Sequence, residues 1–571
     1  MGVAAFRSSM TVSFAALAFP TPTRETLAAR HAAIMAVLDT DRSAALAAFD
    51  TARREHDSWS ALVHLRFSQD TTDAAAKAAR EYADALAPYA TELETAVKRR
   101  LLDDPDRAGL EALAGAHTVR LWANDITTFD PVIAGDLEEE SRLSARYTEL
   151  LASARFTLSK ESGGEGESVN MAGLAPFAEH PIRATRHEAE RLRWSFFADH
   201  REELDSIYDS LVKLRHGMAK KLGDESFTAL GYRRMRRLDY GPAEVARYRK
   251  EVLTHVVPLV DAILDRRRAS NGWDSLCYWD EAFMDPAGNP KPVGDHDTLV
   301  AAAETMFDRM DPRLGDFYRT LRDGGFMDLK NRPTKAGGGF CTSFPSEGTP
   351  FIFANFNGTH HDIGVFTHEM GHAFQAWESR GLPGIDQLWP TMEAAEIHSM
   401  GLEFLTHPQM GLLVGDGAAD RFRAMHLVSS LSFLPYGVCV DHFQHEVYAK
   451  PEATPAERHA MWQKLERLYM PWTYYGDLKH PAMGGRWQAK AHIYNGPFYY
   501  IDYTLALCCA MQFWVRSRQD PKAALDAYVA LCARGGSMGF TGLVESAGLI
   551  SPFKPGALAD VVREAQSFLN A

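Results

Sequence analysis

The sequence predicts a mainly α-helical protein of two lobes, with a small β-sheet beside one central helix. Its 571 residues are 46% hydrophobic, which is enough to bury a core larger than a single domain usually holds. Long stretches are rich in Ala, Leu, Arg and Glu and repeat their apolar residues at helical spacing. The segment 326–359 departs from this pattern, with glycines, prolines and alternating apolar residues that are typical of strands.

The first part of the chain is expected to form antiparallel helices. Glycines are few between Thr23 and about Arg120, and apolar positions recur every three or four residues. The run 162–167 (Ser-Gly-Gly-Glu-Gly-Glu) is the clearest flexible break. We therefore divide the chain near residue 180 into an N-terminal helical region, 1–180, and a second region, 181–571.

The second region begins with further helical patterns over 182–222 and 242–268. Two short strands joined by a loop follow, namely Phe340-Cys-Thr-Ser-Phe344 and Phe351-Ile-Phe-Ala-Asn-Phe-Asn357, with prolines between them. His360 and His361 come next and are expected on a surface loop. Helices are predicted again after Asp520.

The segment that carries chemistry is His368-Glu369-Met370-Gly371-His372. On a helix, residues four positions apart share a face, so His368 and His372 can hold one Zn²⁺ ion together. Glu369 lies about 100° round the helix, where it can reach an attacking water but is poorly placed as a ligand. Gly371 has low helix propensity, so we expect a close neighbour at that turn. The alternative is a buried helix with two core histidines.

A catalytic zinc usually has three protein ligands, so a third is expected downstream. Residues 389–405 predict a helix that begins near Pro390 and carries Glu393, Glu396 and Glu403. Glycines at 381 and 384 allow the chain to turn back between the two helices. One of the three glutamates can be the ligand and the others can orient the imidazoles. A solvated acidic face is the alternative.

These segments resemble a known family. The run Ala336-Gly-Gly-Gly-Phe-Cys-Thr-Ser-Phe-Pro345, the segment 351–359 and the His-Glu-x-x-His helix are similar to the thimet oligopeptidase family of zinc peptidases, most of all to its oligoendopeptidase F branch. The family's third ligand lies in an Ala-Glu-Ile-x-Ser-x-x-x-Glu segment, which places it at Glu396. The resemblance implies a zincin-type fold with a deep substrate channel, and one Zn²⁺ per chain.

A last segment, His492 to Tyr503, is rich in phenols. Peptide hydrolysis creates an oxyanion, which needs hydrogen-bond donors held around it, and phenol and imidazole groups suit that task. The resemblance assigns it to His492, Tyr500 and Tyr503, with Tyr499 able to replace Tyr500. Tyrosines that only pack a core are the alternative.

Substrate contacts are expected at the end of the second strand. The edge of a sheet offers unpaired backbone groups to an extended peptide. We predict contacts at Asn355, Asn357, Gly358 and Thr359, together with Tyr499. A hairpin that merely supports the helix is the alternative.

The sequence therefore predicts a zinc metallo-oligoendopeptidase in which Glu369 is the general base. By resemblance, its partners are short unstructured peptides. A dipeptidyl carboxypeptidase of the same family is one alternative, and a non-catalytic peptide-binding protein with structural zinc is another. An aminopeptidase is disfavoured because no acidic motif for a free α-amine stands out.

Composition limits the partners and the cellular location that we expect for the protein. A net charge of −14 disfavours nucleic acid and anionic membranes as partners. The mean hydropathy is −0.26, and no apolar run approaches the roughly 20 residues of a membrane helix. The apolar stretch 12–20 lacks the flanks of a signal peptide. The six cysteines are scattered, which favours a cytoplasmic protein without a disulfide framework.

Overall fold

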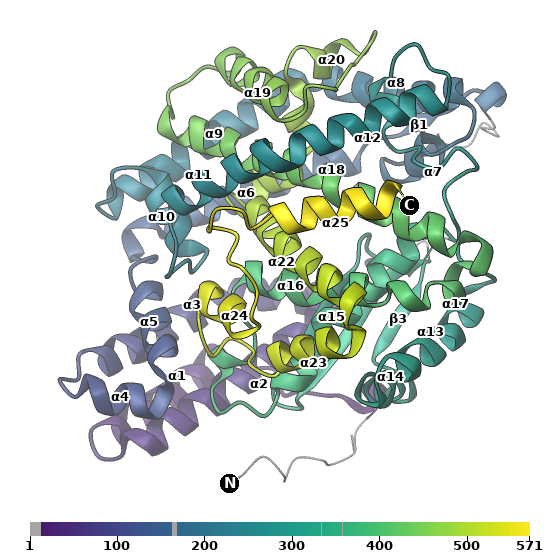
Figure 1. The fold of residues 1–571 in the computed structure, drawn as a ribbon. Helices are drawn as coiled ribbons and strands as arrows, with labels where there is room; N and C mark the ends of the chain where they lie inside the picture. Colours follow the sequence, from purple (N-terminus) through teal and green to yellow (C-terminus); the bar gives the residue numbers. More distant parts are fainter. Residues whose placement is uncertain (1–12, 163–167, 333, 357, 571) are drawn as a thin grey trace. The chain divides into compact units, whose positions relative to one another are not determined.

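Helices dominate the protein, as the sequence predicted, with about 70% of residues helical and 4% in strands. Figure 1 shows the computed structural model, which describes residues 13–162, 168–332, 334–356 and 358–570. Within these ranges, no helix combines the length and the apolarity that crossing a membrane requires.

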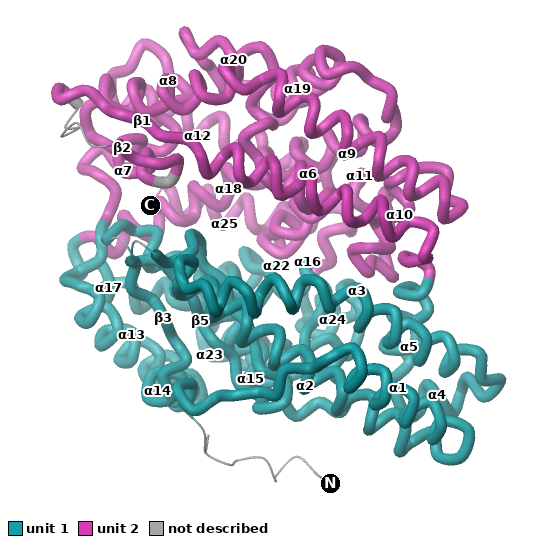
Figure 2. The backbone as a smooth tube through the Cα atoms, turned by 180° about the vertical axis from the view of Figure 1, so that it is seen from behind, with its two compact units in different colours: residues 1–126, 291–417, 509–549 teal, residues 127–290, 418–508, 550–571 magenta. Residues whose placement is uncertain are grey.

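The chain divides into two compact units, and each unit is assembled from three separate segments (Figure 2). Unit 1 comprises residues 1–126, 291–417 and 509–549, and unit 2 comprises residues 127–290, 418–508 and 550–571. The boundary near residue 180 stays a prediction.

Unit 1 holds the N-terminal helices, a three-stranded sheet and the helix with the His-Glu-x-x-His motif. Its elements are α1 (Arg24–Leu38), α2 (Arg42–Gln69), α3 (Ala74–Leu102), α4 (Arg107–Ala114), α5 (Ala116–Asp125), α13 (His296–Met310), α14 (Pro312–Gly324), β3 (Met327–Lys330), β4 (Phe340–Phe344), β5 (Thr349–Phe356), α15 (His360–Ser379), α16 (Met392–Leu405), α17 (Gly411–Val414), α23 (Pro521–Cys532) and α24 (Phe540–Ser546).

The described part of unit 2 is mainly helical and contains one two-stranded pairing. Its elements are α6 (Ala134–Ala152), β1 (Phe156–Thr157), β2 (Ser168–Val169), α7 (Ala175–Ala178), α8 (Arg183–Asp199), α9 (Arg201–Lys221), α10 (Phe227–Arg234), α11 (Pro242–Glu251), α12 (Val257–Ser270), most of α18 (Asp416–Ala449), α19 (Pro455–Tyr469), α20 (Lys479–Ala482), α21 (Ala491–Asn495) and α25 (Ala559–Asn570). Helix α22 (Tyr500–Gln519) belongs to unit 2 up to Cys508 and to unit 1 from Cys509.

The sheet of unit 1 has the strand order β3-β5-β4. The two predicted strands, β4 and β5, pair antiparallel, with Cys341 opposite Ile352. The third strand, β3, was not predicted and pairs parallel with β5, placing Met327 opposite the same Ile352. Strand β5 is therefore central and β4 is an edge strand. Helix α15 packs on both β4 and β5.

Helices α15 and α16 pack against each other in antiparallel directions. His368 of α15 contacts Glu403 near the end of α16. His372, one turn further along α15, lies near Glu396, which is about two turns before Glu403 in α16. Between them Gly371 lies against the α16 backbone. The pair therefore holds one face of each helix in close contact. The reversal of direction between them is what the glycines at 381 and 384 led us to expect.

The helical patterns over 182–222 and 242–268 are each interrupted in the structure. The first divides at His200 into α8 and α9. The second widens into a π-type turn over Val252–Val256 before α12, which has Pro258 in its first turn. A proline lacks the N–H that an α-helix needs and clashes with the preceding turn, so a wider turn before it relieves that conflict.

Candidate active site

A possible metal centre lies where α15 and α16 meet. The ligand atoms of His368, His372 and Glu396 all lie within 4.8 Å of one another. Glu396 Oε2 is 3.2 Å from His368 Nε2 and 3.5 Å from His372 Nε2. Of the three glutamates that the helical pattern left open, Glu396 is thus the one beside both imidazoles. Glu403 contacts the other nitrogen of His368, and Glu393 is buried outside this group.

The polar environment suits a divalent cation. Glu396 is 3% exposed and His372 is 8% exposed. Burial opposes the charged form of Glu396, but the two imidazoles outweigh it and hold its pKa well below the usual range. Burial likewise opposes a charged His368, but hydrogen bonds to Glu396 and Glu403 raise its pKa well above the usual range. Two imidazole nitrogens and one carboxylate oxygen are a donor set that zinc accepts, and three protein ligands leave a fourth position open.

Glu369 is buried beside this group with one oxygen unsatisfied. It is 6% exposed, and its Oε2 has no hydrogen-bond partner among the described residues. Burial is the largest influence on its pKa, which is raised despite the nearby imidazoles. A carboxylate with a raised pKa is a better proton acceptor near neutral pH than an ordinary one.

The glycine-rich segment that precedes β4 lies against the side chains of Val365 and Glu369. A Cβ atom on Gly339 would lie 3.6 Å from Glu369 Oε1 and only 2.8 Å from Val365 Cγ1. Any larger residue at this position would overlap the Val365 side chain, so either that side chain or the segment would have to move. The sequence showed the run of glycines at 337–339 but did not indicate that Gly339 adjoins the carboxylate.

Gly371 has the close neighbour that its low helix propensity led us to expect. A Cβ atom there would be 2.4 Å from the His398 carbonyl oxygen and 2.6 Å from Ser399 Cα. The same carbonyl accepts a 2.8 Å hydrogen bond from the Tyr528 hydroxyl of α23. Glycine therefore sets how closely the two ligand-bearing helices approach, and Tyr528, which sequence reasoning missed, fixes the carbonyl at that contact.

The predicted oxyanion donors form a second group, which lies in unit 2. His492 comes from α21, Tyr499 precedes α22, and Tyr500 and Tyr503 lie in the first turn of α22. The Tyr503 hydroxyl is 3.5 Å from His492 Nε2, and the His492 and Tyr500 rings are 5.0 Å apart. The rings of Tyr499 and Tyr503 are 4.9 Å apart. All four predicted side chains thus lie together.

We call these four side chains, His492, Tyr499, Tyr500 and Tyr503, the phenol group. A strained turn precedes its three tyrosines. Phe498 is buried and has φ +66°, a left-handed conformation that is unfavourable for a bulky residue. Its N–H donates to Gln444 Oε1 at 2.8 Å, and its carbonyl accepts from Arg237 Nη2 at 2.6 Å. The surroundings therefore hold the conformation that directs Tyr499 and Tyr500.

Comparison with known proteins identifies the family. Residues 310–561 match peptidase family M3, and residues 14–129 match the peptidase M3 N-terminal domain. A solved structure described as oligoendopeptidase F is 42% identical over 98% of this chain and 99% of its own, with a TM-score of 0.92. The chain belongs to peptidase family M3.

Two further structures support the same branch of the M3 family. PZ peptidase A, solved with an inhibitor, is 40% identical over 98% of this chain and 99% of its own, with a TM-score of 0.92. A Bacillus anthracis protein described as oligoendopeptidase F is 39% identical over the same shares, with a TM-score of 0.88. No curated protein sequence matches the chain. The protein is thus an M3 peptidase of the oligoendopeptidase F type, and a hydrolase.

In this M3 peptidase the predicted substrate residues have local structural roles. The Asn355 amide donates 2.8 Å hydrogen bonds to the Ala336 and Gly338 carbonyls, so it holds the glycine-rich segment in place. Gly358 has φ +84° and its N–H donates to Asp362 Oδ2 at 2.6 Å, while Thr359 is the N-cap of α15. Asn357 lies outside the described residues. Their contact with substrate stays a prediction.

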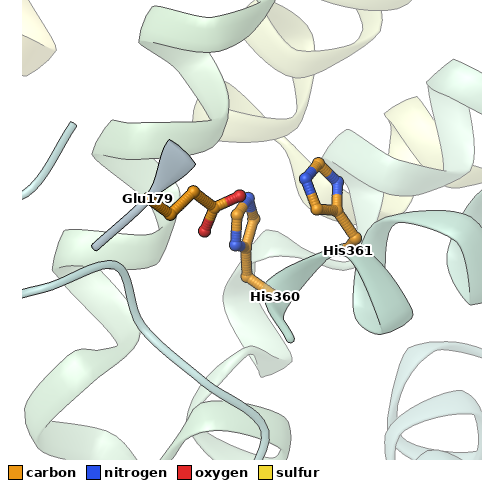
Figure 3. A group of neighbouring side chains, drawn as sticks. All are labelled: Glu179, His360 and His361. Atoms are coloured by element: carbon orange, nitrogen blue, oxygen red, sulfur yellow. The ribbon is translucent and has the colours of Figure 1, made fainter. Parts of the chain in front are cut away.

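His360 and His361 were expected on a surface loop, but they form the start of the M3 peptidase's motif helix. Figure 3 draws both side chains at the beginning of α15, where their rings are 4.2 Å apart. The helix thus begins six residues earlier than the apolar periodicity from Phe366 suggested. The signal that the sequence offered was Asp362, since an acidic residue is common in the first turn.

Proposed function

We propose that this M3 peptidase is a zinc-dependent endopeptidase that cleaves internal bonds of short, unstructured peptides. The observation that carries the proposal is the convergence of His368, His372 and Glu396 beside the buried carboxylate of Glu369. One Zn²⁺ per chain would be held by those three side chains. When bound, zinc supplies a Lewis acid that polarises a carbonyl and makes water a nucleophile near neutral pH.

Glu369 is the proton carrier in this proposal. Its Oε2 lacks a partner among the described residues, so it is available to accept a proton from the attacking water. The raised pKa of Glu369 lets the carboxyl group then donate that proton to the leaving amine. Glu403 orients His368 by accepting a hydrogen bond from its Nδ1–H group. This leaves Nε2 directed at the metal position.

His492, Tyr500 and Tyr503 donate hydrogen bonds to the developing oxyanion in this proposal, with Tyr499 as the alternative to Tyr500. Burial raises the pKa of Tyr500 well above its usual range, so its hydroxyl stays protonated and remains a donor. Donors that are already fixed in place are worth about 3–4 kcal/mol each in such sites. The clustering of the four side chains supports a shared task.

Substrate backbone would pair with the exposed side of the edge strand β4, close to the segment that Asn355 holds. Asn357, Gly358 and Thr359 are the further predicted contacts. A deep channel that admits only unfolded peptides is what the family resemblance implies, and it makes short peptides the substrates.

The test is cleavage of a library of blocked peptides of about ten residues, with the fragments identified by mass. Wild type, chelator-treated enzyme and Glu369→Ala are compared, and zinc content is measured for each. Internal cuts that vanish in both controls, while Glu369→Ala keeps its zinc, support the proposal. Cuts confined to C-terminal dipeptides of unblocked peptides would replace it with a dipeptidyl carboxypeptidase. Absence of cleavage by zinc-loaded wild type would favour a peptide-binding protein.

A further inference from the structure

Lys490 places a positive charge among aromatic rings at the edge of the phenol group. Its Nζ lies 4.8 Å from the centroid of the Tyr500 ring and 5.3 Å from that of Tyr436. The side chain is half-buried, and it follows a short 3₁₀ helix, Gly485–Ala489, just before α21. Ring faces attract a cation but do not neutralise it.

No carboxylate of the described chain pairs with this ammonium group. The charged side chains that influence Lys490 are two cations, Arg193 from α8 and Arg486 from the 3₁₀ helix. Each of those has a carboxylate of its own, with Glu190 at 3.7 Å from Arg193 and Glu466 at 3.3 Å from Arg486. Burial and these two repulsions lower the pKa of Lys490 to about 8.

A half-buried cation that faces other cations is unfavourable for folding, because neither water nor an opposite charge fully compensates it. An apolar side chain of similar length would fill the same space without that penalty. Such an arrangement is characteristic of groups that act on a ligand. The ligand that would relieve it is an anion.

The position of Lys490 indicates which anion. Tyr500 neighbours both Lys490 and His492, since its ring is 5.0 Å from the His492 ring and 4.8 Å from Lys490 Nζ. An anion on Lys490 would therefore lie beside the side chains to which the proposed function assigns the oxyanion. Peptides offer one anion in such a place, which is a carboxylate.

We propose that Lys490 binds a carboxylate of the peptide substrate and so makes this peptidase prefer substrates with an acidic group near the cleaved bond. The proposal rests on the proposed function, because it takes the phenol group as part of the peptide site. The carboxylate belongs either to an Asp or Glu side chain or to the C-terminus of a short peptide. The two sources share one chemistry and are separated by the experiment.

The experiment compares matched peptides that differ only in charge. One pair has a C-terminal acid or amide, and a second series replaces Gln by Glu at each position around the cleaved bond. For each pair the ratio of kcat/KM, charged over neutral, is measured for wild type, Lys490→Met and Lys490→Arg. Lys479→Met is the matched control, because Lys479 is an exposed lysine of the same unit.

For one of the pairs, we expect wild type to have a charged-over-neutral ratio of kcat/KM of about ten or more. A charge-assisted hydrogen bond to the carboxylate gives a preference of that size. It should fall to about one in Lys490→Met and be retained in Lys490→Arg and in Lys479→Met. The pair that responds identifies the carboxylate as C-terminal or side-chain. A wild-type ratio near one for every pair, or a ratio unchanged in Lys490→Met, would overturn the inference.

Two further measurements separate the inference from the function on which it rests. Binding of the same peptides to Glu369→Ala is measured by fluorescence anisotropy, and the acid-to-neutral ratio of Kd should depend on Lys490 whether or not wild type cleaves them. The preference should also decline as pH rises through about 8, where Lys490 loses its proton, and should persist at that pH in Lys490→Arg. A preference that is independent of pH up to 10 would contradict the assignment.

Discussion

Glu403 Oε1 lies 2.7 Å from His368 Nδ1, on the side of the imidazole that faces away from Glu396. The two residues are on α16 and α15, so this hydrogen bond also joins the helices that carry the proposed zinc ligands. With Nδ1 donating to a carboxylate, His368 is held in the tautomer whose Nε2 lone pair can bind a metal.

Replacing Glu403 by Ala should therefore weaken zinc binding without removing a ligand. We expect a 10- to 100-fold loss of zinc affinity, the range that loss of a partner to a ligating histidine usually causes. Glu403→Gln, which can still accept a hydrogen bond, should lose less. Zinc affinity is measured by competition with a chromogenic chelator, and equal affinity in wild type and Glu403→Ala would show that the contact does not orient His368.

The close approach at Gly371 predicts an effect on both stability and zinc binding. In Gly371→Ala the new methyl group would overlap the backbone of α16, at 2.4 Å from the His398 oxygen. Because backbone cannot rotate away, the helices must separate, and we expect a loss of about 3 kcal/mol or more in unfolding free energy together with weaker zinc binding.

Gly364 of the same helix provides the control. A Cβ atom there meets nothing within 4 Å, so Gly364→Ala should be neutral or stabilise the protein by up to about 1 kcal/mol. The two variants are compared by denaturant unfolding, with and without zinc. A Gly371→Ala protein as stable as Gly364→Ala would mean that α15 and α16 tolerate a wider spacing.

Local patterns predicted much of this site. The four-residue spacing of His368 and His372 placed both imidazoles on one face, and the low helix propensity of Gly371 pointed to a close neighbour. The helical pattern could not distinguish Glu396 from Glu393 and Glu403, since that choice depends on how α16 packs on α15. The family resemblance, rather than the spacing, selected Glu396.

Features that depend on contacts between residues far apart in the sequence were not predictable. The sequence indicated β4 and β5, but not β3, whose four residues gain their strand conformation from β5. Consequently β5 is central rather than exposed. Asn355 likewise has the side chain of a substrate-binding residue, yet its amide is bonded to the carbonyls of Ala336 and Gly338. The left-handed conformation of Phe498 gave no sequence signal, because tertiary contacts impose it.

The sheet should be sensitive to acid through Asp328 of β3. Burial alone would raise the pKa of this carboxyl, but hydrogen bonds from Arg332, Lys335 and Gln69 outweigh it and lower the pKa from 3.8 to about 2. A carboxylate with a lowered pKa in the folded state contributes stability above its unfolded pKa and loses it as pH falls through the folded value.

We therefore expect Asp328 to contribute roughly 1–2 kcal/mol at neutral pH, declining between about pH 4 and pH 2. The measurement is the difference in unfolding free energy between wild type and Asp328→Asn across that range. The difference should be constant above pH 5 and shrink below pH 4. A difference that does not change with pH would show that the ion pairs of Asp328 add nothing beyond neutral hydrogen bonds.

The strained turn at Phe498 depends on one buried ion pair. Arg237 Nη2 donates to Asp502 Oδ1 at 2.5 Å and to the Phe498 carbonyl at 2.6 Å, and the side chains of both charged residues are 0% exposed. Removing one charge leaves the other buried without its partner, so Asp502→Ala should lower the unfolding free energy by about 3–5 kcal/mol. Glu139→Ala, which breaks an exposed pair with Arg142 in the same unit, should leave it nearly unchanged, because solvent screens an exposed pair.

Asp502 lies in the same helical turn as Tyr500 and Tyr503, so its loss should also affect catalysis by the folded protein. With Arg237 no longer fixed, the Phe498 carbonyl loses a firmly held donor, and the strained turn can relax and displace the tyrosines. At a temperature where Asp502→Ala is still folded, we expect kcat for a cleaved peptide to fall at least tenfold with KM changed less, as loss of a transition-state contact requires. An equal loss of kcat in Glu139→Ala, or a wild-type kcat in folded Asp502→Ala, would show that the Arg237–Asp502 ion pair does not position the phenol group.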